Sequence, residues 1–110
     1  MSERPGFLIA SDCGISIRSS NDVGEAVGAA LGRGLILSEH DLGPDFFDLR
    51  TGLAGELIQK LVNYRVRAAI IVVTPEAHGP RFGELAHEHT THPTLRFVRS
   101  IDDAMRWMQM

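Results

Sequence analysis

The chain has little cysteine and no excess of positive charge, and both features limit its function. Cys13 is the only cysteine, so no internal disulfide can form. Eleven lysine and arginine residues stand against fourteen aspartate and glutamate residues, which gives a formal net charge of −3. This balance provides no general attraction to nucleic-acid phosphates or to anionic membrane surfaces, so we expect neither as a partner.

The sequence also lacks long apolar runs and a leader-like N-terminus. No apolar run approaches the roughly 20 residues that a membrane-spanning helix needs. The first residues do not show a basic segment followed by an apolar one, as a secretory leader would. We therefore expect a soluble, cytoplasmic protein.

The remaining composition is that of a globular domain. Of the 110 residues, 44% are hydrophobic and 23% are charged, which is enough apolar material for one core but not for two. We predict a single domain over residues 1–110, without a separate lid or catalytic domain. The glycines at positions 14, 24, 28, 32 and 34 form no phosphate-binding or dinucleotide pattern after a predicted strand, so no nucleotide fold is indicated and we expect no cofactor.

The distribution of apolar residues predicts five strands. Continuous apolar runs over residues 35–37 and 68–73 are typical of central strands that are covered on both faces. Residues 94–98 alternate between apolar and polar, which is typical of an edge strand. Residues 7–10 and 15–18 are separated by turn residues, so we predict an N-terminal β-hairpin.

Helical spacing of apolar residues predicts about four helices between and after these strands. The last of them starts with a capping-box-like sequence at Ser100. The predicted helices cover about residues 23–31, about 51–64, from Gly79-Pro80 to His92, and from Ser100 onward. Strands separated by helices require a mostly parallel sheet, and the hairpin adds one antiparallel pair, so we predict an α/β fold with a mixed sheet.

A long central segment resembles one bacterial family. Residues 46–67 read FFDLRTGLAGELIQKLVNYRVR, and this run is similar to the family known as domain of unknown function 4180. The resemblance extends over nearly the whole chain. It departs from the family pattern at two places, where Gly-Asp-Phe and Glu-Ser-Asn are usual and this chain has residues 72–74 (VVT) and 88–90 (EHT).

The predicted element order also resembles the STAS-like domains of anti-sigma-factor antagonists. In those proteins a strand leads into an Asp-Ser-Ser/Thr-Gly-Leu-Gly loop at the start of a helix, and a partner kinase phosphorylates a hydroxyl of the loop. Residues 48–53 (DLRTGL) occupy the corresponding place, with Leu49 and Arg50 instead of the small polar pair. The resemblance implies a non-enzymatic regulatory module with Thr51 as its phosphorylation site. Thr51 also suits a helix cap, and of the two roles we expect the cap.

The candidate binding surface lies at this loop and the helix start. Free backbone N–H groups at a helix start favour an anion, and aromatic and arginine residues are frequent anchors of protein interfaces. We expect a protein partner, with a homodimer through the same surface as an alternative. The candidate binding residues are Phe46, Phe47, Asp48, Arg50, Thr51, Gly52, Glu56 and His40.

The same residues also suit other roles. Asp48 or Thr51 would also cap the helix, and at least one of the two phenylalanines is expected in the core. A second functional hypothesis is a small-molecule site or a simple acid/base step at the carboxyl edge of the sheet. It requires Glu39, His40, Asp41, Asp48, Arg50 and Glu56 to converge. Because no catalytic motif is present, we assign no catalytic residue and favour a non-enzymatic function.

The histidine-rich run 87–92 is compatible in residue type with a zinc site. On a helix, however, His87 and His89 would point about 200° apart. Only His89 and His92 have the i,i+3 spacing that would place two imidazoles on one helix face. Pro93 disfavours helical geometry at His92, so this pair is not expected to hold a metal ion. We therefore predict no metal site.

Overall fold

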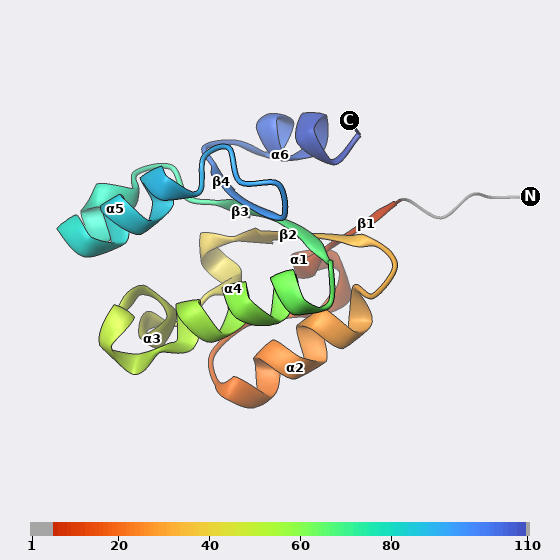
Figure 1. Cartoon of the computed structure of the whole chain (residues 1–110), viewed down its shortest axis with the longest axis horizontal. Helices are drawn as coiled ribbons and strands as arrows, with labels where there is room; N and C mark the ends of the chain where they lie inside the picture. The colour runs from red at the N-terminus through yellow and green to blue at the C-terminus, as the bar shows by residue number, and fades with distance from the viewer. Residues whose placement is uncertain (1–5, 110) are drawn as a thin grey trace, which may run out of the picture.

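A parallel sheet of four strands, in the order β1-β2-β3-β4, forms the centre of the molecule (Figure 1). The structure is a computed structural model that describes residues 6–109. Leu35 pairs in register with Leu8 on one side and with Ala68 on the other, and every neighbouring pair of strands is parallel. The predicted central strands are confirmed as β2 and β3. The strands are β1 (Phe7–Ile9), β2 (Gly34–Ser38), β3 (Arg67–Ile71) and β4 (Leu95–Val98).

Six α-helices and three short 3₁₀ helices complete the described residues. The four longer α-helices lie where the apolar periodicity predicts helices. No helix of residues 6–109 is long and apolar enough to cross a membrane. The α-helices are α1 (Ala10–Cys13), α2 (Ser20–Ala29), α3 (Pro44–Phe47), α4 (Leu53–Asn63), α5 (Pro80–Glu88) and α6 (Ile101–Met108), and the 3₁₀ helices are η1 (Glu39–Asp41), η2 (Leu49–Thr51) and η3 (Pro75–His78).

The predicted N-terminal hairpin is wrong, and the predicted five-stranded mixed sheet is wrong with it. After β1 the chain makes one helical turn, which ends at Gly14 with a left-handed φ of 70°. Serine, aspartate and glycine suit the end of such a turn as well as they suit a hairpin loop. The second predicted strand is reduced to a single parallel bridge between Ile17 and Leu42, with the Ile17 side chain fully buried.

Both faces of the sheet are covered, but unequally. Figure 1 shows α2 and α4 on one side of the sheet and α6 on the other. Leu35, Leu37 and alternate residues of the neighbouring strands belong to the larger core under α2 and α4. Ile36 and Ala69 belong to a smaller core that Trp107 of α6 closes. Since successive strand residues are buried on opposite faces, β2 and β3 have continuous apolar sequences.

Helix α4 ends in a Schellman motif that has arginine where glycine is usual. The Val66 N–H donates to the Leu61 carbonyl at 2.9 Å, and the Arg65 N–H donates to the Val62 carbonyl at 3.2 Å. Arg65 has a φ of 56° and is the only non-glycine residue with a positive φ among residues 6–109. The backbone at this position is therefore strained.

Replacing Arg65 by glycine is expected to raise the free energy of unfolding by up to about 1.5 kcal/mol. Glycine removes the strain of the left-handed conformation, which costs a residue with a Cβ about 1–2 kcal/mol. The greater flexibility of glycine in the unfolded chain offsets about 0.5–1 kcal/mol of this stabilisation. Urea denaturation followed by circular dichroism measures the change. Arg65→Ala keeps the Cβ and is the matched control, so an equal gain in both variants would show that backbone strain is not the cause.

Candidate functional site

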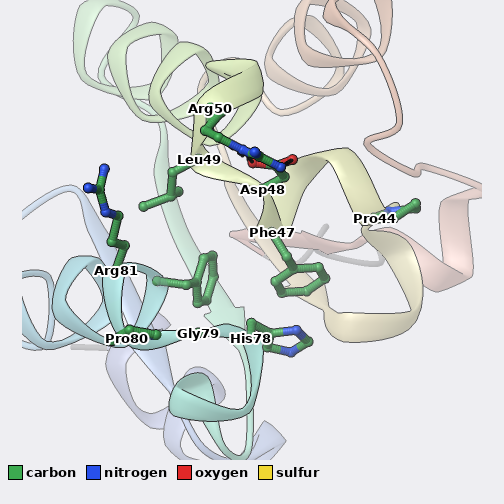
Figure 2. A pocket seen from close by; sticks show the side chains of 10 residues that line it. Pro44, Phe47, Asp48, Leu49, Arg50, His78, Gly79, Pro80 and Arg81 are labelled. Carbon is green, nitrogen blue, oxygen red and sulfur yellow. Dashed lines mark hydrogen bonds and ion pairs between the residues drawn. The ribbon is translucent and has the colours of Figure 1, made fainter.

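An open groove of about 720 Å³ lies at the carboxyl edge of the sheet (Figure 2). One wall comes from α3 and η2, which follow β2, and the other comes from η3 and the start of α5, which follow β3. Parallel strands bring both connections to the same edge. The lining residues are Pro44, Phe47, Asp48, Leu49, Arg50, His78, Gly79, Pro80, Arg81 and Phe82.

Aromatic rings join the two walls. The Phe47 ring stacks on the His78 imidazole with 3.8 Å between the ring centroids and 11° between the planes. Phe82 of α5 lies 5.1 Å from Phe47 and 5.6 Å from His78 by the same measure. Phe46 lies fully buried behind them, with its ring edge-on to Phe47 at 5.6 Å. Phe47 therefore lies on the groove, and Phe46 belongs to the core that holds it in place.

The carboxylate of Glu39 contacts His78, the histidine that lines the groove. The His78 Nε2 atom lies 3.4 Å from the Glu39 Oε2 atom, and Glu39 Oε1 accepts a hydrogen bond from the Val73 N–H at 3.1 Å. Glu39 thus links η1, after β2, to the segment after β3. The His78 side chain is only 25% exposed, and both the ring stack and this carboxylate hold it in its orientation.

Asp48 and Arg50 form an ion pair on the rim of the groove. Arg50 Nε and NH2 each lie 2.9 Å from a different carboxylate oxygen of Asp48, and the Arg50 backbone N–H donates to Oδ1 at 3.1 Å. The hydrogen bonds from the Arg50 side chain, followed by that from its backbone, lower the pKa of Asp48 below its ordinary value. The charge of Arg50 is therefore already compensated within the chain.

Replacing Arg50 by alanine is expected to raise the pKa of Asp48 toward the ordinary aspartate value. The hydrogen bonds from the Arg50 side chain are the largest cause of the lowered pKa, and the variant removes them. A carboxylate with a lowered pKa stabilises the fold above the pKa of the unfolded chain, about 4. This contribution is lost as the pH falls through the lower pKa of the folded state. NMR titration of the Asp48 carboxyl carbon measures the shift, and Arg81→Ala, on the opposite wall, should leave it unchanged.

Thr51 and Gly52 shape the start of α4. The Thr51 hydroxyl lies 2.6 Å from the Asp45 carbonyl oxygen and 2.8 Å from that of Asp48, and it accepts a hydrogen bond from the Leu53 N–H at 3.2 Å. Gly52 has a φ of 78°, a left-handed conformation that favours glycine. Both residues therefore have structural roles at this helix start.

Arg81 is the uncompensated charge of the groove. Its side chain is exposed at the second position of α5, and among residues 6–109 it forms no hydrogen bond or ion pair. Gly79, just before this helix, has a φ of 107° and a ψ of 158°, a region that is essentially limited to glycine. This backbone turn directs the chain into α5 and places Arg81 beside the groove.

Of the predicted binding residues, Phe47, Asp48 and Arg50 line the groove, whereas Phe46, Thr51, Gly52, Glu56 and His40 do not. Glu39 and Asp41 of the acid/base hypothesis do not line it either. His40 is exposed on η1. Asp41 is buried and accepts hydrogen bonds from the Ser38 N–H and hydroxyl at 2.9 and 3.0 Å. Glu56 accepts a hydrogen bond from the Ser20 hydroxyl at 2.7 Å, which links α4 to α2. The six polar residues of the acid/base hypothesis therefore do not form one site.

The histidine-rich run also has structural contacts. The ring centroids of His89 and His92 lie 5.3 Å apart. His92 Nδ1 accepts hydrogen bonds from the Thr94 and Leu95 N–H groups, and His89 Nδ1 lies 2.8 Å from the Leu85 carbonyl oxygen. Within residues 6–109, no three histidine, cysteine, aspartate or glutamate side chains are grouped to hold a metal ion.

The sequence interpretation did not identify His78 and Arg81 as site residues. Both flank the Gly79-Pro80 helix start, and both follow the predicted central strand that becomes β3. Residues after neighbouring parallel strands meet at one edge, so this position was a usable signal. The predicted site includes only residues of the segment after β2.

Comparisons with known proteins place the chain in a family. Neither the search of curated proteins nor that of solved structures found a match. The family model with the description "Domain of unknown function (DUF4180)" matches residues 7–108, which include both walls of the groove. The chain therefore belongs to the DUF4180 family.

Proposed function

We propose that the protein is a non-enzymatic interaction module whose groove binds an acidic, apolar segment of a partner protein. The observation that carries this proposal is the groove itself, in which apolar walls and one uncompensated arginine lie together at the carboxyl edge of the sheet. The edge is where open α/β sheets commonly bind their ligands.

The walls favour an apolar contact. Phe47 and Leu49 are half-buried, and Pro44 and Pro80 are exposed, so these side chains present apolar surface to a ligand. The stacking of Phe47 on His78 fixes the ring before a ligand binds. A wall of this kind binds with little loss of conformational freedom.

The charge of the groove favours an acidic segment. Arg50 is paired with Asp48, whereas Arg81 has no partner among residues 6–109. A carboxylate would form a charge-assisted hydrogen bond with the Arg81 guanidinium, which presents a planar set of donors.

The resemblance of residues 48–53 to the loop of STAS-like antagonists implies a finer, regulatory role through phosphorylation of Thr51, which the contacts of Thr51 oppose. A phosphate on Thr51 would break the contacts of its hydroxyl with the Asp45 and Asp48 carbonyls and would add negative charge close in sequence to these two aspartates. We therefore expect Thr51 to remain unmodified and binding to be constitutive. Stoichiometric phosphate on Thr51, found by mass spectrometry of protein from its native host, would overturn this expectation.

A phage-displayed library of random 12-residue peptides tests the proposal. We expect selected peptides to carry aspartate or glutamate beside a large apolar residue, and their amide forms with asparagine or glutamine to bind less tightly. Arg81→Ala should weaken binding by about tenfold or more, since it removes a charge-assisted hydrogen bond. Phe47→Ala should weaken it as well, while Lys60→Ala on α4 serves as the control for loss of an ordinary surface charge.

NMR chemical shifts locate the bound peptide. Shifts confined to residues of both walls, including Phe47, His78 and Arg81, would support the groove as the site. Binding that persists unchanged in both Arg81→Ala and Phe47→Ala would overturn it. Failure to select peptides, together with saturable binding of small carboxylates in the groove, would favour a small-molecule function instead.

A further inference from the structure

A second hollow, of about 320 Å³, lies between the end of β4 and α6 and is rich in arginine. Figure 1 shows these two elements together at the C-terminal end of the chain. Arg96, Arg99 and Arg106 line the hollow, and Asp103 is its only carboxylate. The hollow is therefore positively charged, although the chain as a whole has a formal net charge of −3.

Most N–H groups of these three arginines have no acceptor among residues 6–109. Arg96 donates to the His92 carbonyl at 2.9 Å and, at 3.5 Å, to that of Thr91. Arg99 NH1 donates to a backbone carbonyl at 3.2 Å, and Arg106 NH1 lies 3.3 Å from the Asp103 carboxylate. Since each guanidinium has five N–H donors, these contacts leave the greater part of the donor capacity unused.

Arg96 is held in place before any ligand binds. Its guanidinium carbon lies 4.7 Å from the centroid of the Trp107 ring, and that of Arg67 lies 4.6 Å from the same ring. Arg67 also donates to the Trp107 carbonyl at 2.7 Å. Trp107 thus brings one further cation, Arg67, to the ring that Arg96 covers, and Asp103 is the only carboxylate among the residues that line the hollow.

We propose that this hollow binds a small phosphate-bearing ligand. Three guanidinium groups from a strand, the following loop and a helix can donate to several oxygens of one tetrahedral phosphate. A carboxylate offers a single planar pair of oxygens and a single charge, so it matches this arrangement less well. The site shares no residue with the groove at the carboxyl edge and is independent of the function proposed there.

Titration with inorganic phosphate tests the proposal. We expect saturable NMR shifts of the side-chain Nε–H signals of Arg96, Arg99 and Arg106 at constant ionic strength, with a Kd below about 1 mM, and tighter binding of pyrophosphate. Affinity should fall as salt is added because the charges are exposed. The double variant Arg99→Ala/Arg106→Ala should weaken binding by at least about tenfold and, since both side chains are exposed, should fold normally.

Matched variants separate this site from the groove. Arg81→Ala should bind phosphate like the unmodified protein, whereas loss of phosphate binding in that variant would contradict the assignment to the α6 hollow. Shifts that do not saturate, or that sodium chloride reproduces at equal ionic strength, would overturn the proposal. Tighter binding of a phosphoserine peptide than of pyrophosphate would overturn its restriction to small ligands.

Discussion

Replacing Phe46 by alanine is expected to lower the free energy of unfolding by about 3–5 kcal/mol, the usual cost of removing a large buried ring. Phe46 is 0% exposed and belongs to the larger core. Its ring lies edge-on to Phe47 at 5.6 Å and to Phe82 at 6.2 Å, so its removal leaves a cavity behind the groove. Urea denaturation followed by circular dichroism measures the loss.

The neighbouring residue provides the matched control. Phe47 is half-buried, and its ring stacks on His78 at the groove surface. Phe47→Ala should therefore cost clearly less stability than Phe46→Ala, because part of the ring already contacts solvent. Relative to the stability that each variant loses, Phe47→Ala should nevertheless weaken peptide binding more than Phe46→Ala does. Equal losses of stability in the two variants would contradict the division into a core ring and a groove ring.

The central strands could be predicted because burial on both faces leaves a signal in the sequence itself. Residues 35–37 and 68–73 are apolar without alternation, and the structure places 35–37 in β2 and 68–71 in β3, between two cores. The predicted run is too long at its end, because β3 stops at Ile71 and Val73 is exposed. The N-terminal segment has no comparable signal. Its turn residues suit a hairpin and a helical turn equally, and contacts distant in sequence, such as that of Ile17 with Leu42, decide between them.

The candidate site could be predicted only in part, for a related reason. Phe47, Asp48 and Arg50 are close in sequence and line the groove as one wall. His78 and Arg81 lie about thirty residues further along the chain and reach the groove only because β2 and β3 are parallel neighbours. The adjacent phenylalanines also show the limit of composition, because nothing in their order reveals which of the two is buried.

Replacing Trp107 by alanine is expected to lower the free energy of unfolding by about 3–5 kcal/mol through loss of the smaller core. Trp107 is 5% exposed and packs with Ile36, Ala69 and Ala104 on the face of the sheet that α6 covers. The free energy of unfolding of an ordinary domain is about 5–15 kcal/mol, so this loss would be a large fraction of the total. Since Trp107 is the only tryptophan, unfolding must be followed by circular dichroism rather than by fluorescence.

Two variants of the same helix show whether the ring or the helix is responsible. Ile101→Ala changes an α6 residue that is 42% exposed, so it should alter stability by no more than about 0.5 kcal/mol. Trp107→Phe keeps an aromatic ring in the core and should cost less than Trp107→Ala. If Trp107→Ala cost no more than Ile101→Ala, α6 would not stabilise the sheet.

The same variant should also affect the arginine-rich hollow. Arg96 lies over the Trp107 ring and should lose its fixed position in Trp107→Ala. Phosphate binding in the hollow should therefore weaken together with the loss of the smaller core.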